Sequence, residues 1–113
     1  MDFVIKANDL LPSMSVTLFN TRGPMDLTGL LVYYRYGPVE KGSGIASREI
    51  LCTVVDAVRG KVQVDWVAGN TFPPGLYRGE FTATNGAVKY TYPGVGYVSM
   101  QINPRVPAPG DTY

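Results

Sequence analysis

Apolar and polar residues alternate one by one along several short stretches of this chain. The clearest case is Val62, Val64 and Trp66, which are separated by Gln63 and Asp65. A period of two is typical of a β-strand that has one buried face. The pattern predicts strands over residues 13–18, 30–36, 49–56, 61–66, 76–84, 87–92 and 96–102.

Turn-forming residues separate these stretches. Asn85-Gly86 predicts a β-hairpin with a type I′ turn, because both residues tolerate the positive φ that this turn needs. Short strands with turn signals about every 8–12 residues, and no long helical period, are typical of all-β sandwiches and small barrels. Of these two architectures we favour an antiparallel β-sandwich of about seven or eight strands.

The alternation also predicts which side chains form the core. Residues that face one way along each predicted strand are aliphatic or aromatic, and their burial is the dominant favourable term in folding. The predicted core consists of Val16, Leu18, Val32, Val54, Val62, Val64, Trp66, Tyr77, Phe81, Val98, Met100 and Ile102.

The two ends of the chain are candidate contacts between protein molecules. Residues 103–113 are rich in proline and predict an extended, polyproline-like arm that follows a domain of residues 1–102. Such a segment has little ordering entropy to lose on binding, and an exposed strand edge can accept an added strand. The candidate interaction residues are Phe3, Ile5, Pro104, Val106, Pro107, Pro109 and Tyr113.

Composition and charge narrow the possible functions. The 113 residues are 45% hydrophobic and 17% charged, which is typical of one folded domain. The formal net charge of +1 gives no positive field, so we expect no nucleic-acid partner. The first residues lack the basic and apolar regions of a signal peptide, and no apolar run is long enough for a membrane span, so we expect a soluble chain.

The residue types that most catalytic and metal sites need are missing. The chain has no histidine and one cysteine, which removes imidazole bases, zinc sites with several Cys or His ligands, and an intrachain disulfide. The nine acidic residues are scattered, without the paired spacing of a hydrolase. We therefore expect no catalytic residue, no cofactor and no metal, and we expect Cys52 to be a small buried apolar residue.

The eight tyrosines support an alternative function. Aromatic rings on one face of a sheet can stack on sugars, so a carbohydrate-binding module is the second hypothesis. Tyrosine also suits half-buried strand positions, where its ring packs inward and its hydroxyl reaches water. The tyrosines considered for a sugar-binding platform are Tyr33, Tyr34, Tyr36, Tyr90, Tyr92 and Tyr97.

Several segments resemble one known family. They are residues 3–9, residues 16–18 followed by 23–29, the strand that ends at Trp66, and residues 73–81. Together they resemble the N-terminal immunoglobulin-like domain of the phage baseplate upper protein family over roughly residues 3–102. The resemblance implies an immunoglobulin-like β-sandwich, in which residues 26–29 lead into the second core strand and residues 74–77 open a later one. No catalytic residue comes with this resemblance.

The resemblance implies a non-enzymatic structural protein of a bacteriophage virion, assembled in the host cytoplasm. Members of the family usually continue into a stalk and a receptor-binding end. A freestanding sandwich is therefore expected to be an adaptor or accessory subunit of the baseplate, tail, neck or capsid surface. Within this class, a capsid decoration protein or a head-fibre base is the alternative. The expected partners are other virion proteins and further copies of the same chain.

Overall fold

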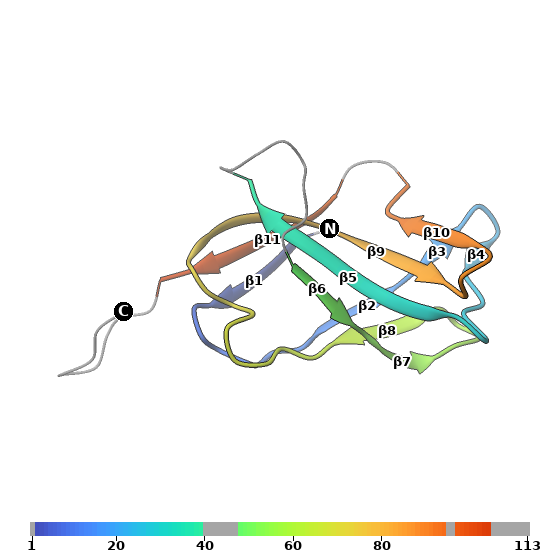
Figure 1. The fold of residues 1–113 in the computed structure, drawn as a ribbon, viewed down its shortest axis with the longest axis horizontal. Helices are drawn as coiled ribbons and strands as arrows, with labels where there is room; N and C mark the ends of the chain where they lie inside the picture. Colours follow the sequence, from blue (N-terminus) through green and yellow to red (C-terminus); the bar gives the residue numbers. More distant parts are fainter. Residues whose placement is uncertain (1, 40–47, 95–96, 105–113) are drawn as a thin grey trace.

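All regular elements of the structure are β-strands. The computed structural model describes residues 2–39, 48–94 and 97–104, and these residues contain no helix (Figure 1), which confirms the all-β prediction. The strands are β1 (Asp2–Lys6), β2 (Met14–Thr17), β3 (Phe19–Asn20), β4 (Gly23–Pro24), β5 (Leu31–Pro38), β6 (Arg48–Leu51), β7 (Thr53–Asp56), β8 (Lys61–Val64), β9 (Gly75–Thr84), β10 (Lys89–Tyr92) and β11 (Val98–Asn103).

The predicted number of strands is too low. The described residues form 11 strands, because three segments behave differently from the prediction. Residues 2–6 form an additional strand, residues 19–24 form the short β3–β4 hairpin, and the stretch over residues 49–56 divides into β6 and β7. Asn103, predicted as the first residue of the C-terminal arm, is the last residue of β11.

The larger sheet has the strand order β1-β11-β9-β5-β6, with β10 paired to β9. Strand β1 runs parallel to β11, from Asp2 opposite Ser99 to Lys6 opposite Asn103, whereas the other pairs in this sheet are antiparallel. The prediction of a wholly antiparallel fold is therefore wrong at this edge. No hairpin joins the first strand to the last one, so no short turn imposes the antiparallel direction.

The smaller sheet has the order β2-β8-β7, and the chain enters it directly from the larger sheet (Figure 1). The crossing point is Cys52, whose N–H still donates to the carbonyl of Val32 on β5 at 2.8 Å. Strand β6 therefore ends one sheet and β7 ends the other. No described strand pairs with the outer side of either one, so together they form one continuous open side.

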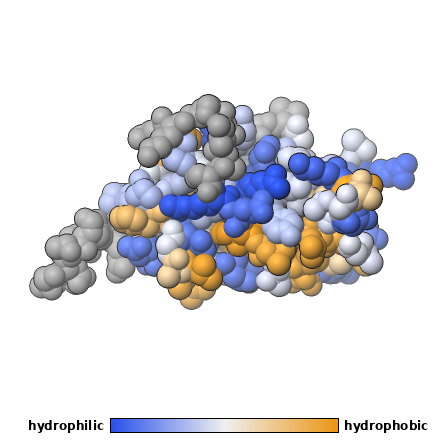
Figure 2. Space-filling view, viewed as in Figure 1, coloured by the Kyte–Doolittle hydropathy of each residue, from blue (hydrophilic) through white to orange (hydrophobic). Residues whose placement is uncertain are grey.

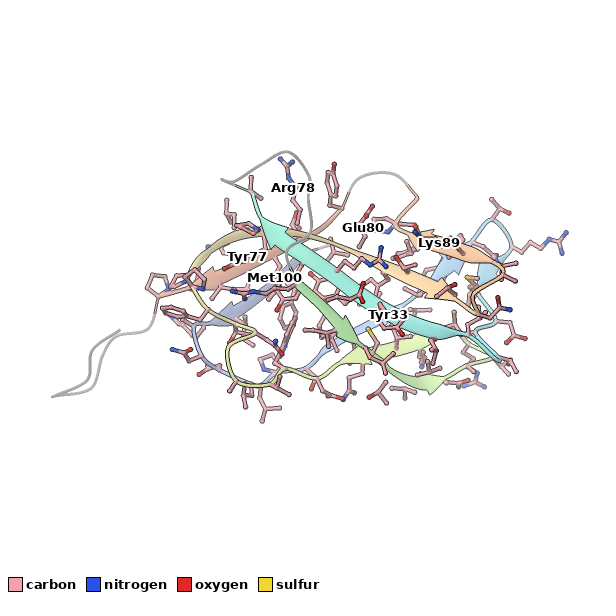
Figure 3. The ribbon with its side chains drawn as sticks, viewed as in Figure 1. Tyr33, Tyr77, Arg78, Glu80, Lys89 and Met100 are labelled. Carbon is pink, nitrogen blue, oxygen red and sulfur yellow. The ribbon has the colours of Figure 1, made fainter. Side chains whose placement is uncertain are left out.

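One core lies between the two sheets (Figure 3). All predicted core residues except Val54 are buried. Val54 is only partly buried and packs against the core, since β7 is the outer strand of its sheet. Trp66 lies at the centre of an aromatic cluster, with its ring 6.2 Å from that of Tyr34 and 6.1 Å from that of Tyr36.

Strands β9 and β10 form the predicted hairpin, but the predicted type I′ turn is wrong. Lys89 pairs with Thr84, which leaves a loop of residues 85–88 between the strands. In this loop only Gly86 has a positive φ, of 92°. The Asn85 side chain instead accepts hydrogen bonds from the N–H groups of Ala87 and Val88, so it satisfies the backbone inside the loop.

Candidate functional site

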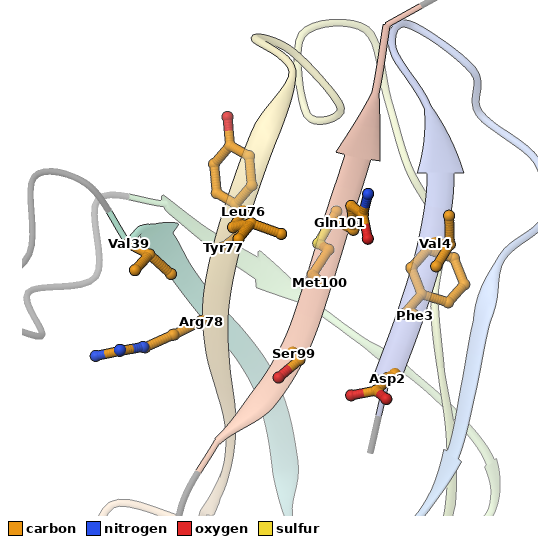
Figure 4. A pocket seen from close by; sticks show the side chains of 10 residues that line it. All are labelled: Asp2, Phe3, Val4, Val39, Leu76, Tyr77, Arg78, Ser99, Met100 and Gln101. Atoms are coloured by element: carbon orange, nitrogen blue, oxygen red, sulfur yellow. The ribbon is translucent and has the colours of Figure 1, made fainter.

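A shallow depression of about 440 Å³ lies on the outer face of the larger sheet, over β1, β11 and β9 (Figure 4). We call it the outer groove. Successive side chains of a strand point to opposite faces, so alternate residues of these strands leave the core and surround the depression. The outward-facing residues among them are Asp2, Val4, Leu76, Arg78, Ser99 and Gln101, and Val39 follows β5. The inward-facing Phe3, Tyr77 and Met100 also line the depression.

Strand register places an apolar row across the outer groove. Val4 of β1 is opposite Gln101 of β11, and Gln101 is opposite Leu76 of β9. Val4 is 54% exposed and Leu76 is 56% exposed, so two aliphatic side chains face water on either side of one amide group. A partner that covers them would remove apolar surface from water, which favours association.

The neighbouring row carries both signs of charge. Asp2 is opposite Ser99, and Ser99 is opposite Arg78. The Arg78 guanidinium lies over the ring of Tyr97, 5.2 Å from its centre. The outer groove therefore offers a carboxylate, a hydroxyl, an amide and a guanidinium around aliphatic side chains. This mixture suits contact with another polypeptide, since the cores of protein interfaces are apolar and their rims are polar.

The outer groove does not combine the groups of a hydrolytic site. Ser99 supplies the aliphatic hydroxyl of the outer groove. The lining residues include no histidine or lysine that could act as its base. Among the described residues, no three Asp, Glu, Cys or His side chains come together as metal ligands. The chemistry available in the outer groove is hydrogen bonding, ion pairing and apolar contact.

The open side formed by β6 and β7 is the second exposed feature. Its most exposed apolar side chains are Leu51, at 58%, and Val55, at 59%. Figure 2 shows hydrophobic atoms gathered over these two strands. Glu49 on β6 forms an ion pair with Arg35 of the neighbouring strand. An unpaired strand edge with exposed apolar side chains is a site where another chain can add.

Asp65 is the centre of a polar cluster next to the smaller sheet. Its carboxylate accepts hydrogen bonds from Gln63 Nε2 at 2.7 Å, Ser13 Oγ at 3.0 Å and Thr53 Oγ1 at 3.1 Å. These bonds lower the pKa of Asp65 below its ordinary value of 3.8, and the bond from Gln63 has the largest effect. The cluster joins β7, β8 and the residues before β2, so its role is to connect these segments.

We expect the Asp65→Asn variant to be less stable than the wild type at pH 7, with a gap that closes in acid. A lowered pKa means that the folded state favours the carboxylate, so the stabilisation is complete above about pH 4 and is lost as the pH falls through the folded-state pKa. Urea unfolding followed by circular dichroism at pH 7 and at pH 2 measures the gap. An equal gap at both pH values would contradict the role of the charge.

The tyrosines considered for a sugar platform do not lie together. Tyr34 and Tyr36 are fully buried and their rings stack, with centres 5.1 Å apart. Tyr90 and Tyr92 are partly buried and pack against the core. Of the other two, Tyr97 is exposed beside Arg78, whereas Tyr33 is partly buried on β5, opposite Leu51 of β6.

The positive charge of Arg48 lies beside two core tyrosines, Tyr36 and Tyr77. Its guanidinium donates to the carbonyls of Asn70 and Phe72 and lies over the rings of Tyr36 and Tyr77. Burial raises the pKa of Tyr36, and the adjacent guanidinium opposes this shift. Arg48 thus connects β6 to the loop before β9, which is a structural role.

Two single residues occupy the environments that the sequence indicated. Trp66 is only 4% exposed, and its indole N–H donates to the carbonyl of Pro12 at 3.1 Å. Cys52 is buried, and burial raises the pKa of its thiol to about 12. A thiol with such a pKa is almost entirely protonated at neutral pH, so it is a poor nucleophile.

The candidate interaction residues differ in their positions. Ile5 is 3% exposed, so its prediction as an interaction residue is wrong: side chains of β1 alternate between faces, and Ile5 points into the core. Phe3 is partly buried, with its ring 5.7 Å from that of Trp66, while Pro104 is exposed and accepts a hydrogen bond from Lys6 Nζ. The remaining candidates, Val106, Pro107, Pro109 and Tyr113, lie outside the described residues.

Comparisons with known proteins do not identify a family. The sequence matches no protein-family model, and it matches no curated protein. In the described ranges there is no helix long and apolar enough to cross a membrane. The resemblance to the phage baseplate upper protein family therefore stays a prediction.

Sequence reasoning did not find the outer groove. Val4, Leu76 and Gln101 come from three segments that are far apart along the chain, and only the pairing of β1, β11 and β9 brings them together. The one available signal was the alternation within residues 76–84 and 96–102, which assigns Leu76 and Gln101 to the outer face.

Proposed function

We propose that this chain is a non-enzymatic structural protein of a bacteriophage virion, an immunoglobulin-like β-sandwich that packs against other virion proteins. The assignment to a phage rests on the sequence resemblance. The binding role rests on the outer groove, where Val4 and Leu76 stay more than half exposed beside polar side chains.

The strand order supports an immunoglobulin-like arrangement. In immunoglobulin domains the three strands of one sheet, C, F and G, are the third, sixth and seventh, and the variable type adds a strand beside C. Here β11, β9, β5 and β6 follow the corresponding order G, F, C and C′, while β2, β8 and β7 follow the order B, E and D in the facing sheet. The short β3–β4 hairpin and β10 are additions to this plan.

Tyr77 provides a second, independent support. It lies near the start of β9, and its hydroxyl donates to the carbonyl of Pro73, four residues earlier, at 2.6 Å. This is the geometry of the tyrosine corner of immunoglobulin domains. Gly79, two residues later, stands where antibody domains place their second cysteine, and a Cβ atom there would overlap the ring of Tyr34. The Tyr34 ring thus fills the space beside β9 in the centre of the core.

The outer groove favours a protein partner over a small ligand. It is open along the sheet, and it displays side chains from three strands rather than enclosing a cavity (Figure 4). Small molecules are usually held in concave sites that bury most of their surface. An open face with exposed aliphatic and charged side chains is instead typical of an interface between proteins.

Mass spectrometry of particles purified after infection tests the virion assignment. We expect the chain in the purified particles, and its enrichment in separated tails or in separated heads distinguishes a baseplate or tail adaptor from a capsid decoration protein. Absence from the particles, with the protein present in the lysate, would overturn the virion assignment.

The outer groove is tested by the double variant Val4→Glu/Leu76→Glu in cosedimentation with particles that lack the chain. We expect a drop in binding of about tenfold or more, because two charges would be placed in the apolar row of the interface. Val58→Glu is the matched control, since Val58 is a 68% exposed valine outside the outer groove. Equal binding by both variants would exclude this face as the contact.

A further inference from the structure

Two residues of β6 direct their backbone groups away from the sheet, and no described strand pairs with them. In an antiparallel pair, the N–H and C=O of successive residues point alternately toward the partner strand and away from it. The N–H of Cys52 donates to Val32 on β5, so the backbone groups of Ile50 and Arg48 also point toward β5. The N–H and C=O groups of Glu49 and Leu51 therefore point away from the sheet, and within the described residues no strand pairs with this side of β6.

This edge of the larger sheet is less protected than the opposite one. At the β1 edge the N–H of Ala7 donates to Asn103, so the outward-facing residues are Asp2, Val4 and Lys6. Charged side chains, lysine above all, protect an edge from pairing with another chain. The outward-facing residues of β6 are Leu51, which is 58% exposed, and Glu49, whose charge is balanced by Arg35.

The outward-facing N–H and C=O groups of Glu49 and Leu51 can pair with the same groups of a second copy. If two copies of β6 pair in antiparallel fashion about a twofold axis, Glu49 of one copy meets Leu51 of the other only when the axis passes through Ile50. In that register the outward-facing N–H and C=O groups of Glu49 and Leu51 in both copies all form hydrogen bonds. An axis at Glu49 would instead place two carboxylates opposite each other, which is destabilising. An axis at Leu51 would place Glu49 opposite Thr53, which belongs to the smaller sheet.

We propose that two copies of this chain associate through β6, with Ile50 opposite Ile50 of the second copy on a twofold axis. The larger sheets of the two copies then form one continuous sheet. Four hydrogen bonds join Glu49 and Leu51 across the axis, and the Leu51 side chains cover part of each other's strand. The dimer is a contact between copies, so it does not depend on the virion assignment, and it leaves the outer groove of each copy free.

Disulfide trapping tests the register in purified protein. In a Cys52→Ala background, a single cysteine is placed at residue 50, 49 or 51. The Ile50→Cys pair would be a non-hydrogen-bonded pair with Cα atoms about 4.5 Å apart, which a disulfide can bridge. We expect rapid formation of a covalent dimer for Ile50→Cys and little for Glu49→Cys or Leu51→Cys. A dimer trapped by either of the other two cysteines, but not by Ile50→Cys, would overturn the proposed axis.

Sedimentation equilibrium with edge-blocking prolines tests the dimer without a crosslink. Leu51→Pro removes an outward-facing N–H and leaves the bonds to β5, and we expect it to raise the dissociation constant about tenfold or more. Val4→Pro is the matched control, because it removes an outward-facing N–H at the β1 edge; we expect less than about a twofold change. Circular dichroism verifies that both variants fold. A wild-type chain that remains monomeric at millimolar concentration, or equal effects of the two prolines, would overturn the proposal.

Discussion

Replacing Trp66 by alanine is expected to lower the free energy of unfolding by about 3–5 kcal/mol. The indole is 4% exposed and packs against Phe3, Tyr34 and Tyr36, so its loss leaves a cavity between the two sheets. The variant also leaves the carbonyl of Pro12 without its donor. A domain of this size has a total stability of about 5–15 kcal/mol, so the variant is expected to be close to unfolding at 37 °C.

Urea unfolding followed by far-ultraviolet circular dichroism measures this loss, since the variant has no tryptophan for fluorescence. Val58→Ala is the control: its side chain is 68% exposed, and we expect a change within about 0.5 kcal/mol. If the Trp66→Ala variant lost less than about 1 kcal/mol, the indole could not be in the centre of the core.

Replacing Gly60 by alanine is expected to cost about 2–5 kcal/mol, from two causes that add. Gly60 has a φ of +70°, a conformation that is unfavourable for a residue with a Cβ atom. The new Cβ would also lie 2.7 Å from the carbonyl oxygen of Leu18 and 2.8 Å from that of Met25. Both are backbone atoms, so the loop and the segment of residues 18–25 would have to move apart.

Gly86→Ala separates the two causes. Gly86 also has a positive φ, of 92°, but a Cβ there would meet no atom within 4 Å. We expect its free energy of unfolding to fall only by the cost of the positive φ, about 1–2 kcal/mol. Thermal unfolding of both variants measures the difference. Equal losses would mean that the close approach of Leu18 and Met25 to Gly60 has no energetic consequence.

Contacts between distant segments decided two of the wrong predictions. The stretch over residues 49–56 alternates as one strand would, yet its two halves pair with different partners, β5 and β8. Residues 2–6 have a strand-like composition, but their pairing with β11 places Ile5 in the core. Local pattern contains no information on which strand lies beside which.

The candidate sites show the same limit. Residues 76–84 and 96–102 alternate so regularly that the outward direction of Leu76 and Gln101 follows from the sequence. That they lie beside Val4 follows only from the parallel pairing of β1 with β11. The outward direction of the backbone groups of Glu49 and Leu51 depends on the direction of the β5–β6 hydrogen bonds, which no side chain specifies.

The all-β class and most of the core could be predicted from the alternation of apolar and polar side chains, since this alternation reflects burial of one face of each strand. The sequence also indicated the environment of Trp66, whose neighbours along the chain alternate with polar residues. The strand order, the parallel edge and the outer groove could not be predicted in this way. These features arise from backbone hydrogen bonds and packing between residues that are far apart in the chain, and backbone groups are chemically the same at almost every residue.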